Sequence, residues 1–138
     1  MIRLELPWPP SVNKARGERR YGQTPHTYTA KAVKIYRKTV AAICMMQRVK
    51  PLKGELICGL QLHPSKGSRM DVDNALKVVL DALVKAGCMA DDRQIKTLLV
   101  DHQGERIEEA SITCALYPRA GVKRLEVIID KGCLIHKT

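Results

Sequence analysis

The sequence predicts an α/β (α+β) fold: one domain spanning residues 1–138, with two helices packed on a small mixed sheet in the order β-α-β-α-β-β. Three observations support this. Hydrophobic residues make up 45% of the 138 residues, a normal share for a chain long enough to bury a core. Several short segments alternate apolar and polar residues, as half-buried strands do. Two longer segments repeat apolar residues at helical spacing.

The predicted strands are short alternating segments that end at residues unable to continue a ladder. Residues 2–6 alternate and run into a proline-rich stretch, and residues 55–63 alternate up to Pro64. Residues 94–101 and 110–116 form the next two predicted strands. A further strand over 125–129 follows the break at 118–121, and it could extend the sheet edge or exchange with a partner chain.

The predicted helices cover residues 29–48 and 71–86. Thr29 can cap the first helix, whose exposed side carries Lys31, Lys34 and Lys38. The second helix has the strongest signal, because its apolar residues recur over four turns between Asp71 as N-cap and Gly87 at the C′ position. Residues 12–28 show no sustained period, which predicts a long exposed basic loop.

The charge balance indicates a polyanionic partner. The formal net charge is +10, and between Lys14 and Lys38 eight basic residues face one acidic residue. Nucleic acid is the first candidate and an anionic membrane the second, while a solvated basic face is the purely structural alternative. The predicted nucleic-acid-binding residues are Lys14, Arg16, Arg19, Arg20, Lys66 and Arg69.

The length of the apolar runs, the N-terminal residues and the spacing of the cysteines predict the cellular location. The longest apolar run is far shorter than the roughly 20 residues of a membrane-spanning helix, and residues 1–5 do not resemble a signal peptide. The five cysteines are scattered without zinc-site spacing, which predicts reduced residues, mostly in the core. We therefore expect a cytoplasmic protein without a membrane partner.

Acidic residues at the start of the second helix suggest a metal site. Asp71 and Asp73 stand at its N-terminal end, and Asp91 or Asp92 in the turn after it could supply a third carboxylate. Such oxygen ligands suit Mg²⁺ or Mn²⁺ better than zinc. Lys77 lies one turn after Asp73, where its charge could stabilise a phosphate under attack.

Each of these residues also has a purely structural interpretation. An Asp at a helix start is a common cap, Asp73 with Lys77 can be an ordinary ion pair, and Asp favours turns. Asp81, one turn beyond Lys77, is more often ion-paired or solvated than functional. The residues alone leave open a non-catalytic basic DNA- or RNA-binding module. They also leave open a metal-dependent phosphohydrolase for small substrates, although the density of positive charge argues against it.

Several segments together resemble the RusA family of Holliday junction resolvases. They are Leu6-Pro7-Trp8-Pro9-Pro10-Ser11 with Asn13, Asp71-Val72-Asp73-Asn74-Ala75-Leu76-Lys77, Asp81-Ala82-Leu83, Lys85-Ala86-Gly87 and Asp91-Asp92. They follow one another over residues 4–116, which leaves residues 119–138 as an extension beyond the family's core.

The resemblance implies a homodimeric, Mg²⁺-dependent endonuclease, with Mn²⁺ as a substitute ion, that cuts four-way DNA junctions by paired symmetrical nicks. The process served would be recombination and repair or phage DNA processing. By position, Asp71, Asp73 and Asp92 match the family's metal-binding catalytic aspartates, and Lys77 matches its catalytic lysine. Asp91 is adjacent and stays ambiguous.

Overall fold

The computed structural model describes residues 1–10, 25–65, 72–102, 109–120, 126–130 and 133–137. The elements follow one another along the chain as β1 (Ile2–Pro7), α1 (Pro25–Met46), β2 (Leu56–His63), α2 (Val72–Lys85), the 3₁₀ helix η3 (Asp92–Gln94), β3 (Ile95–His102), β4 (Ser111–Pro118), β5 (Glu126–Asp130) and β6 (Cys133–Lys137). The predicted order β-α-β-α-β-β is confirmed, and the C-terminal addition consists of two strands instead of one.

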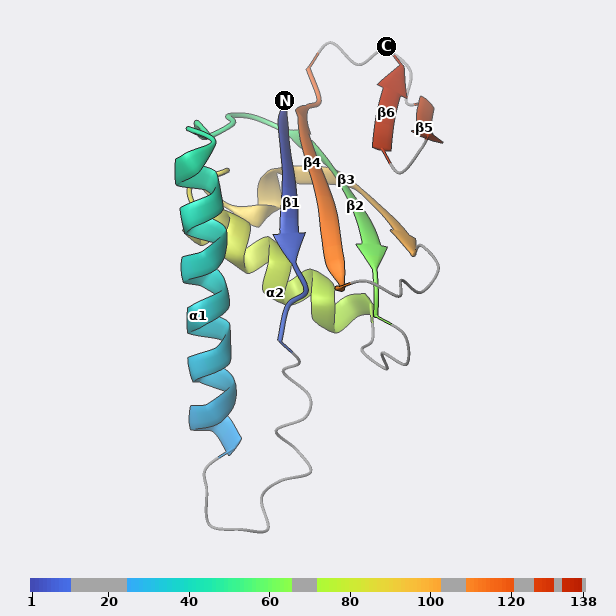
Figure 1. The fold of residues 1–138 in the computed structure, drawn as a ribbon. Coiled ribbons are helices and arrows are strands. Elements are labelled where there is room, and N and C mark those ends of the chain that lie inside the picture. Colours follow the sequence, from blue (N-terminus) through green and yellow to red (C-terminus); the bar gives the residue numbers. More distant parts are fainter. Residues whose placement is uncertain (11–24, 66–71, 103–108, 121–125, 131–132, 138) are drawn as a thin grey trace.

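Four strands form a mixed sheet in the order β1-β4-β2-β3 (Figure 1). β4 runs antiparallel to both of its neighbours, while β2 and β3 are parallel and are joined through α2. β2 therefore occupies the interior of the sheet, and all eight of its residues are buried. The sequence predicted a half-buried strand here; the difference arises because both of its faces are covered.

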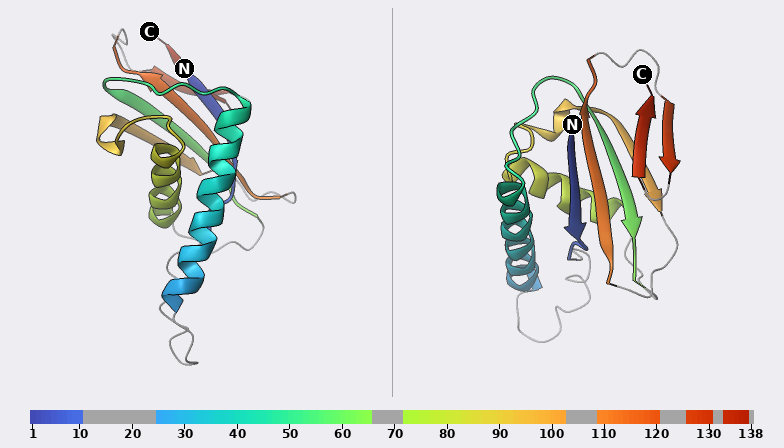
Figure 2. Two further views of the ribbon diagram at one scale, coloured as in Figure 1. Left: turned by 90° about the vertical axis from the view of Figure 1, so that its left-hand side faces the viewer. Right: turned by 45° about the horizontal axis from the view of Figure 1, so that its top comes forward.

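Both helices pack against one face of this sheet (Figure 2). The core between the layers takes alternate residues of β1, β2 and β4 together with the apolar stripes of the helices, including Leu4, Leu60, Leu116, Val40 and Leu83. Tyr36 of α1 is also buried, and its hydroxyl donates to the Pro7 carbonyl at 2.9 Å. These contacts hold α1 along β1 and place α2 behind the centre of the sheet.

Each helix ends in a Schellman motif. At the end of α1, Val49 N–H donates to Cys44 O at 3.0 Å and Arg48 N–H donates to Met45 O at 3.1 Å. The equivalent bonds of α2 run from Cys88 and Gly87. The left-handed residue of α2 is the predicted Gly87, with φ 86°, whereas α1 places Arg48 in this conformation, with φ 54°.

The first helix differs from the prediction at its start. α1 begins at Pro25 instead of Thr29, so the last four residues of the predicted basic loop are helical. Proline suits the first turn of a helix because its fixed φ is helical and its missing N–H would have no partner there. The rest of that loop lies outside the described residues.

The face of the sheet opposite the helices carries a polar network. Thr113 Oγ1 donates to the Glu5 carboxylate at 2.8 Å and lies 3.2 Å from His63 Nε2, which therefore donates to it. Gln61, opposite Thr113 in the sheet register, is fully buried, and its amide has no hydrogen-bond partner among the described residues. A short apolar cluster of Ile57, Ala115 and Tyr117 completes this face.

The C-terminal strands form a separate antiparallel hairpin, in which Ile128 faces Ile135. β5 and β6 do not pair with the edge of the four-stranded sheet, which was one of the two predicted outcomes. β6 contacts β2, and since β3 and β4 flank β2 within the sheet, this contact reaches β2 from the face opposite the helices.

Four of the five cysteines are buried and free: Cys44, Cys58, Cys88 and Cys114. This confirms the prediction of reduced core cysteines at these positions. None of the described helices combines the length and apolar character that a bilayer crossing requires.

Candidate active site

The N-terminal end of α2 presents two of the predicted catalytic residues. Asp73 is the second residue of α2 and Lys77 lies one turn later, and both side chains are exposed. Within the described part of the chain, no ion pair joins them. The structure therefore does not show the ordinary surface ion pair that was the alternative interpretation of this spacing, and both charges face solvent.

The second acidic position lies in η3, directly before β3. Asp91 is the N-cap of this short helix: its carboxylate accepts from Arg93 N–H at 2.8 Å and from Arg93 Nη2 at 2.9 Å. The Arg93 guanidinium holds the pKa of the Asp91 carboxyl well below its usual range. Asp92 is the first residue of η3 and is exposed. The cap function occupies the Asp91 carboxylate, whereas Asp92 takes no part in this cap.

Gln94 fixes the position of η3, and nothing in the sequence singled it out. Its Oε1 accepts from the N–H groups of Ala90 and Asp91, at 2.8 and 3.1 Å. Its Nε2 donates to the carbonyls of Leu52 and Gly54, each at 3.0 Å. All of its amide hydrogen-bonding groups are thus engaged, and η3 is tied to the segment that precedes β2. Asp92 is carried by a rigidly held turn.

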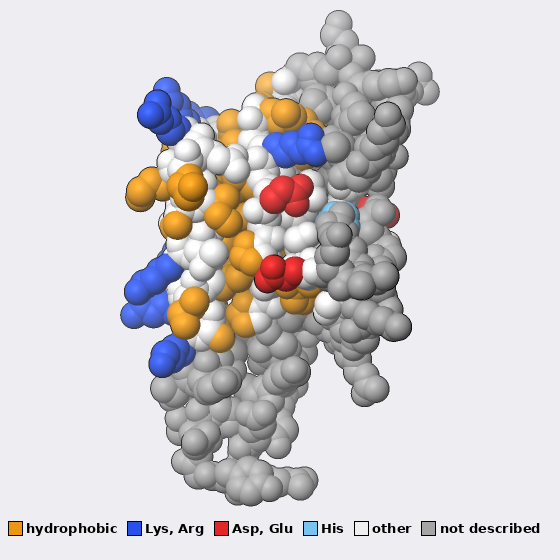
Figure 3. All heavy atoms as spheres, in the orientation of Figure 1, with side chains coloured by type: hydrophobic (Ala, Val, Ile, Leu, Met, Phe, Trp, Pro, Cys, Tyr) orange, Lys and Arg blue, Asp and Glu red, His pale blue; other side chains and the backbone are white. Residues whose placement is uncertain are grey.

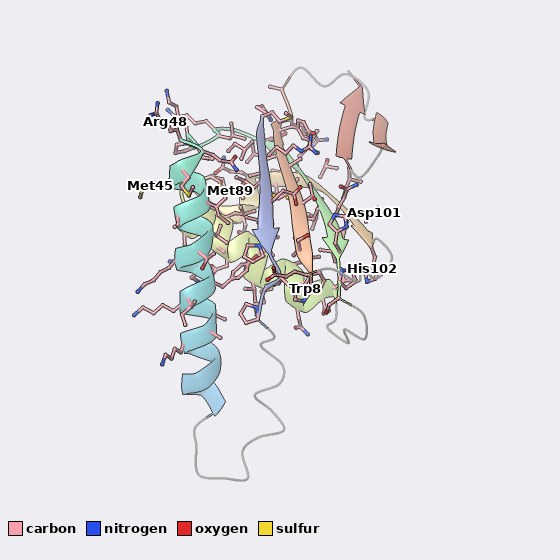
Figure 4. The ribbon with its side chains drawn as sticks, viewed as in Figure 1. Trp8, Met45, Arg48, Met89, Asp101 and His102 are labelled. Carbon is pink, nitrogen blue, oxygen red and sulfur yellow. The ribbon has the colours of Figure 1, made fainter. Side chains whose placement is uncertain are left out.

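Asp73 and Asp92 lie at opposite ends of α2. From Asp73 to Lys85 the helix rises about 18 Å, at roughly 1.5 Å per residue. In Figure 1 the N-terminal end of α2 lies below the C-terminal ends of β2 and β3, whereas η3 lies at the other end, where β3 begins. Figure 4 shows the same separation: Met89, between α2 and η3, lies beside α1, and His102 lies at the far end of β3.

This separation decides which acidic residues of one chain can act together. Oxygen ligands of Mg²⁺ lie about 2.1 Å from the ion, so carboxylates at the two ends of α2 cannot bind the same cation. Among the described residues, no three His, Cys, Asp or Glu side chains are grouped closely enough to hold a metal ion. The structure brings Asp73 and Lys77 together but keeps Asp92 of the same chain away from them.

Asp71 and all six predicted phosphate contacts, Lys14, Arg16, Arg19, Arg20, Lys66 and Arg69, lie outside the described residues. Asp81 is placed, and it forms an ion pair with Arg37 that joins α2 to α1. This confirms the structural interpretation of Asp81. The predicted basic side of α1 is also confirmed, since Lys31, Lys34 and Lys38 are exposed.

Comparison with known proteins shows to which family the chain belongs. A family model described as "Endodeoxyribonuclease RusA" matches residues 7–114, which include α1, β2, α2, η3, β3 and the first half of β4, while β1 lies outside the match except for Pro7. The chain belongs to the RusA family. It is thus an endodeoxyribonuclease by family, and the match ends within β4, so the β5–β6 hairpin lies beyond it.

Curated relatives agree with the family model. The "Crossover junction endodeoxyribonuclease RusA" of Escherichia coli (strain K12) is 30% identical over 96 residues, which cover 67% of this chain and 74% of that protein. The protein of the same name from Enterobacteria phage 82 matches to the same extent. That of Escherichia coli O139:H28 is 30% identical over 104 residues, covering 72% of this chain and 78% of the relative.

Proposed function

We propose that this RusA-family protein resolves four-way DNA junctions by paired symmetrical nicks, as a homodimer whose two active sites each combine residues of both copies. Asp71, Asp73 and Lys77 would come from one copy and Asp92 from the other. The observation that supports this is the position of the exposed Asp73 and Asp92 at opposite ends of α2. The cellular setting would be the cytoplasm, in recombination and repair or in phage DNA processing.

A symmetric dimer reconciles the separated acids with one metal site. In an isologous pair, a contact from Asp73 of one copy to Asp92 of the other is repeated by the second Asp73 and the first Asp92. One interface therefore creates two equal sites. A four-way junction has near two-fold symmetry, so two equal sites match two equivalent strands.

The donor set fits Mg²⁺, with Mn²⁺ as a substitute. Carboxylate oxygens are the ligands that these hard cations prefer, and the described acids of the set are exposed and so can reach an ion between two copies. A divalent ion held there would lower the pKa of a bound water and polarise the phosphate. Lys77, one helical turn from Asp73, would place a positive charge beside the phosphate as negative charge develops on it.

DNA binding would rest on the basic residues around this site. Lys31, Lys34 and Lys38 recur at helical spacing along the exposed side of α1. Figure 3 shows Lys and Arg side chains along the outer edge of this helix. We expect these lysines to contact DNA phosphates together with Lys14, Arg16, Arg19, Arg20, Lys66 and Arg69.

The test is cleavage of an end-labelled four-way junction and a matched linear duplex, each with Mg²⁺, Mn²⁺ or EDTA. We expect metal-dependent nicks at symmetrical positions in the junction only. Asp73→Asn and Lys77→Gln should each lower the nicking rate by about 100-fold or more while junction binding is retained. Asp81→Asn is the matched control on the same helix, because its carboxylate pairs with Arg37, and it should keep cutting.

Two other results of this assay would contradict the proposal. Junction binding without nicks under any divalent ion would leave a non-catalytic basic DNA-binding module. Unchanged nicking by Asp73→Asn would show that the cutting centre lies elsewhere on the molecule.

A further inference from the structure

A cavity of about 310 Å³ opens where α1 ends beside the start of β1. Its lining residues are Met1, Ile2, Arg3, Gln47, Arg48, Val49, Lys50 and Leu52. Its volume is near the lower limit of small-molecule sites, which run from about 300 to 1,000 Å³. A small polar group therefore fits better than a large ligand.

The lining of this cavity is positively charged. It includes three basic side chains, Arg3, Arg48 and Lys50, and no acidic one. Arg48 and Lys50 are exposed, so their charged groups can reach a ligand at the surface. Figure 3 shows basic side chains at this end of the molecule, over the C-terminal end of α1 and over the upper part of β1 and β4. The charge favours an anion.

The backbone conformation of Arg48 is a second, independent observation that points to a ligand at this cavity. Arg48 is the left-handed C′ residue of α1, with φ 54°, and Figure 4 shows it at the C-terminal end of this helix. Glycine is the usual residue in this conformation because a Cβ is strained there, and α2 indeed uses Gly87. Arginine is an uncommon residue in this conformation, and a binding role of its side chain would account for its presence there.

The cavity is also connected to the proposed active site. Leu52, part of its lining, donates its N–H to Cys88 O at 2.9 Å and accepts from Gln94 Nε2 at 3.0 Å. The Gln94 side chain in turn accepts from the backbone N–H of Asp91, the N-cap of the 3₁₀ helix that carries Asp92. Hydrogen bonds thus hold the cavity wall and Asp92 as one unit at the same end of the sheet.

We propose that this cavity binds a phosphodiester group of the DNA backbone on the strand that is cut, through Arg48 and Lys50. The proposal rests on the function proposed above. Arginine binds phosphate oxygens through paired N–H groups, and lysine adds a compact positive charge. The cavity would hold the strand in register while Asp92 takes part in the adjoining site.

The decisive variant is Arg48→Gly, because glycine keeps the left-handed turn and removes the side chain. We expect it to raise the melting temperature by about 3 °C, since the backbone strain is relieved. We expect the double variant Arg48→Gly, Lys50→Gln to bind a four-way junction about tenfold more weakly at low salt. The slope of log affinity against log salt should fall by between about 1 and 2, one for each lost phosphate contact. Lys85 is an exposed lysine outside the cavity, so Lys85→Gln is the control and should change neither the junction affinity nor the salt slope.

A protein that becomes more stable and yet binds DNA less well cannot be explained by a structural role of Arg48. If the wild type binds and nicks the junction but the double variant keeps its affinity and salt slope, the cavity assignment is wrong while the proposed function stands. If the wild type does not bind the junction, the proposed function itself fails. A titration with deoxyadenosine monophosphate separates the two sources of phosphate: saturation that depends on Arg48, with unchanged junction affinity, would contradict a DNA-backbone site.

Discussion

Two inactive variants should restore each other's activity when mixed. In the proposed dimer, every site needs Asp73 of one copy and Asp92 of the other. An Asp73→Asn homodimer and an Asp92→Asn homodimer therefore each lack an intact site. A mixed dimer of the two has one site with both native aspartates and one site with neither.

The expected yield follows from this geometry. The rise of about 18 Å from Asp73 to the far end of α2 prevents the two carboxylates of one chain from sharing an ion. Random exchange of equal amounts of the two variants makes half of the dimers mixed, so about a quarter of all sites are intact. Each mixed dimer has one working site, so the product should be a junction nicked in one strand instead of a symmetrically nicked pair.

The assay uses a junction labelled on two opposing strands, with the variants mixed under conditions that allow subunits to exchange. The matched control mixes Asp73→Asn with Lys77→Gln. Asp73 and Lys77 are one turn apart on the same helix and serve the same site, so no pairing of these two variants creates an intact site.

Two outcomes would refute the reasoning. If the Asp73→Asn and Asp92→Asn mixture exchanges subunits and binds junctions but does not nick them, Asp92 does not act across the interface. If the control mixture regains activity to the same extent, the recovery does not report on the separation of the two aspartates.

Other predictions concern the core. Burial raises the pKa of the Cys88 thiol to about 12 from a value of 9.0, so at pH 8 this thiol should react with iodoacetamide about a thousandfold more slowly than in the unfolded chain, roughly in proportion to its thiolate fraction. Rapid labelling of native protein at Cys44, Cys58, Cys88 or Cys114, read by mass spectrometry, would contradict the buried placement. The folded state holds the Cys88 proton more tightly, so the contribution of this thiol to the free energy of unfolding should be constant below about pH 9 and fall as the pH rises towards about 12. Urea denaturation over this range measures it, and a rise in the free energy of unfolding would have the wrong sign. Tyr36→Phe removes the hydroxyl that donates to the Pro7 carbonyl and should lower the free energy of unfolding by about 1 to 2 kcal/mol, whereas no change would show that water satisfies this carbonyl equally well.

The second helix and the main strands could be predicted because local signals agree there. Apolar residues recur at helical spacing up to Gly87, and the structure places α2 over Val72–Lys85, within a residue of the prediction at each end. Alternation likewise located β1, β2, β3 and β4 to within two residues. Where periodicity, caps and breakers point to the same boundaries, a single sequence is sufficient.

The features that could not be predicted depend on which strands become neighbours. Alternation in residues 55–63 predicted a half-buried strand, but both faces of β2 are covered, so Gln61 and His63 are buried as well. The Gln94 Nε2 group donates to the carbonyls of Leu52 and Gly54, about 40 residues away in the sequence, and no local sequence pattern predicts such contacts. The left-handed Arg48 gave no signal either, because sequence rules expect glycine at that position.

The topology of the sheet also explains why the predicted catalytic residues could be selected from the sequence although their arrangement in space could not. Asp73 and Asp92 are only 19 positions apart in the sequence, which suggests one compact cluster. Between them α2 runs from one end of the parallel pair β2–β3 to the other, because the chain must return to the start of β3 after leaving the end of β2. Any parallel crossover of this kind separates residues that flank its helix by the length of that helix.

If the separated acids act together only between two copies, as proposed, an isolated copy has no complete site. Cutting then depends on dimer formation, and the two sites that a junction needs for paired nicks are completed at the same moment.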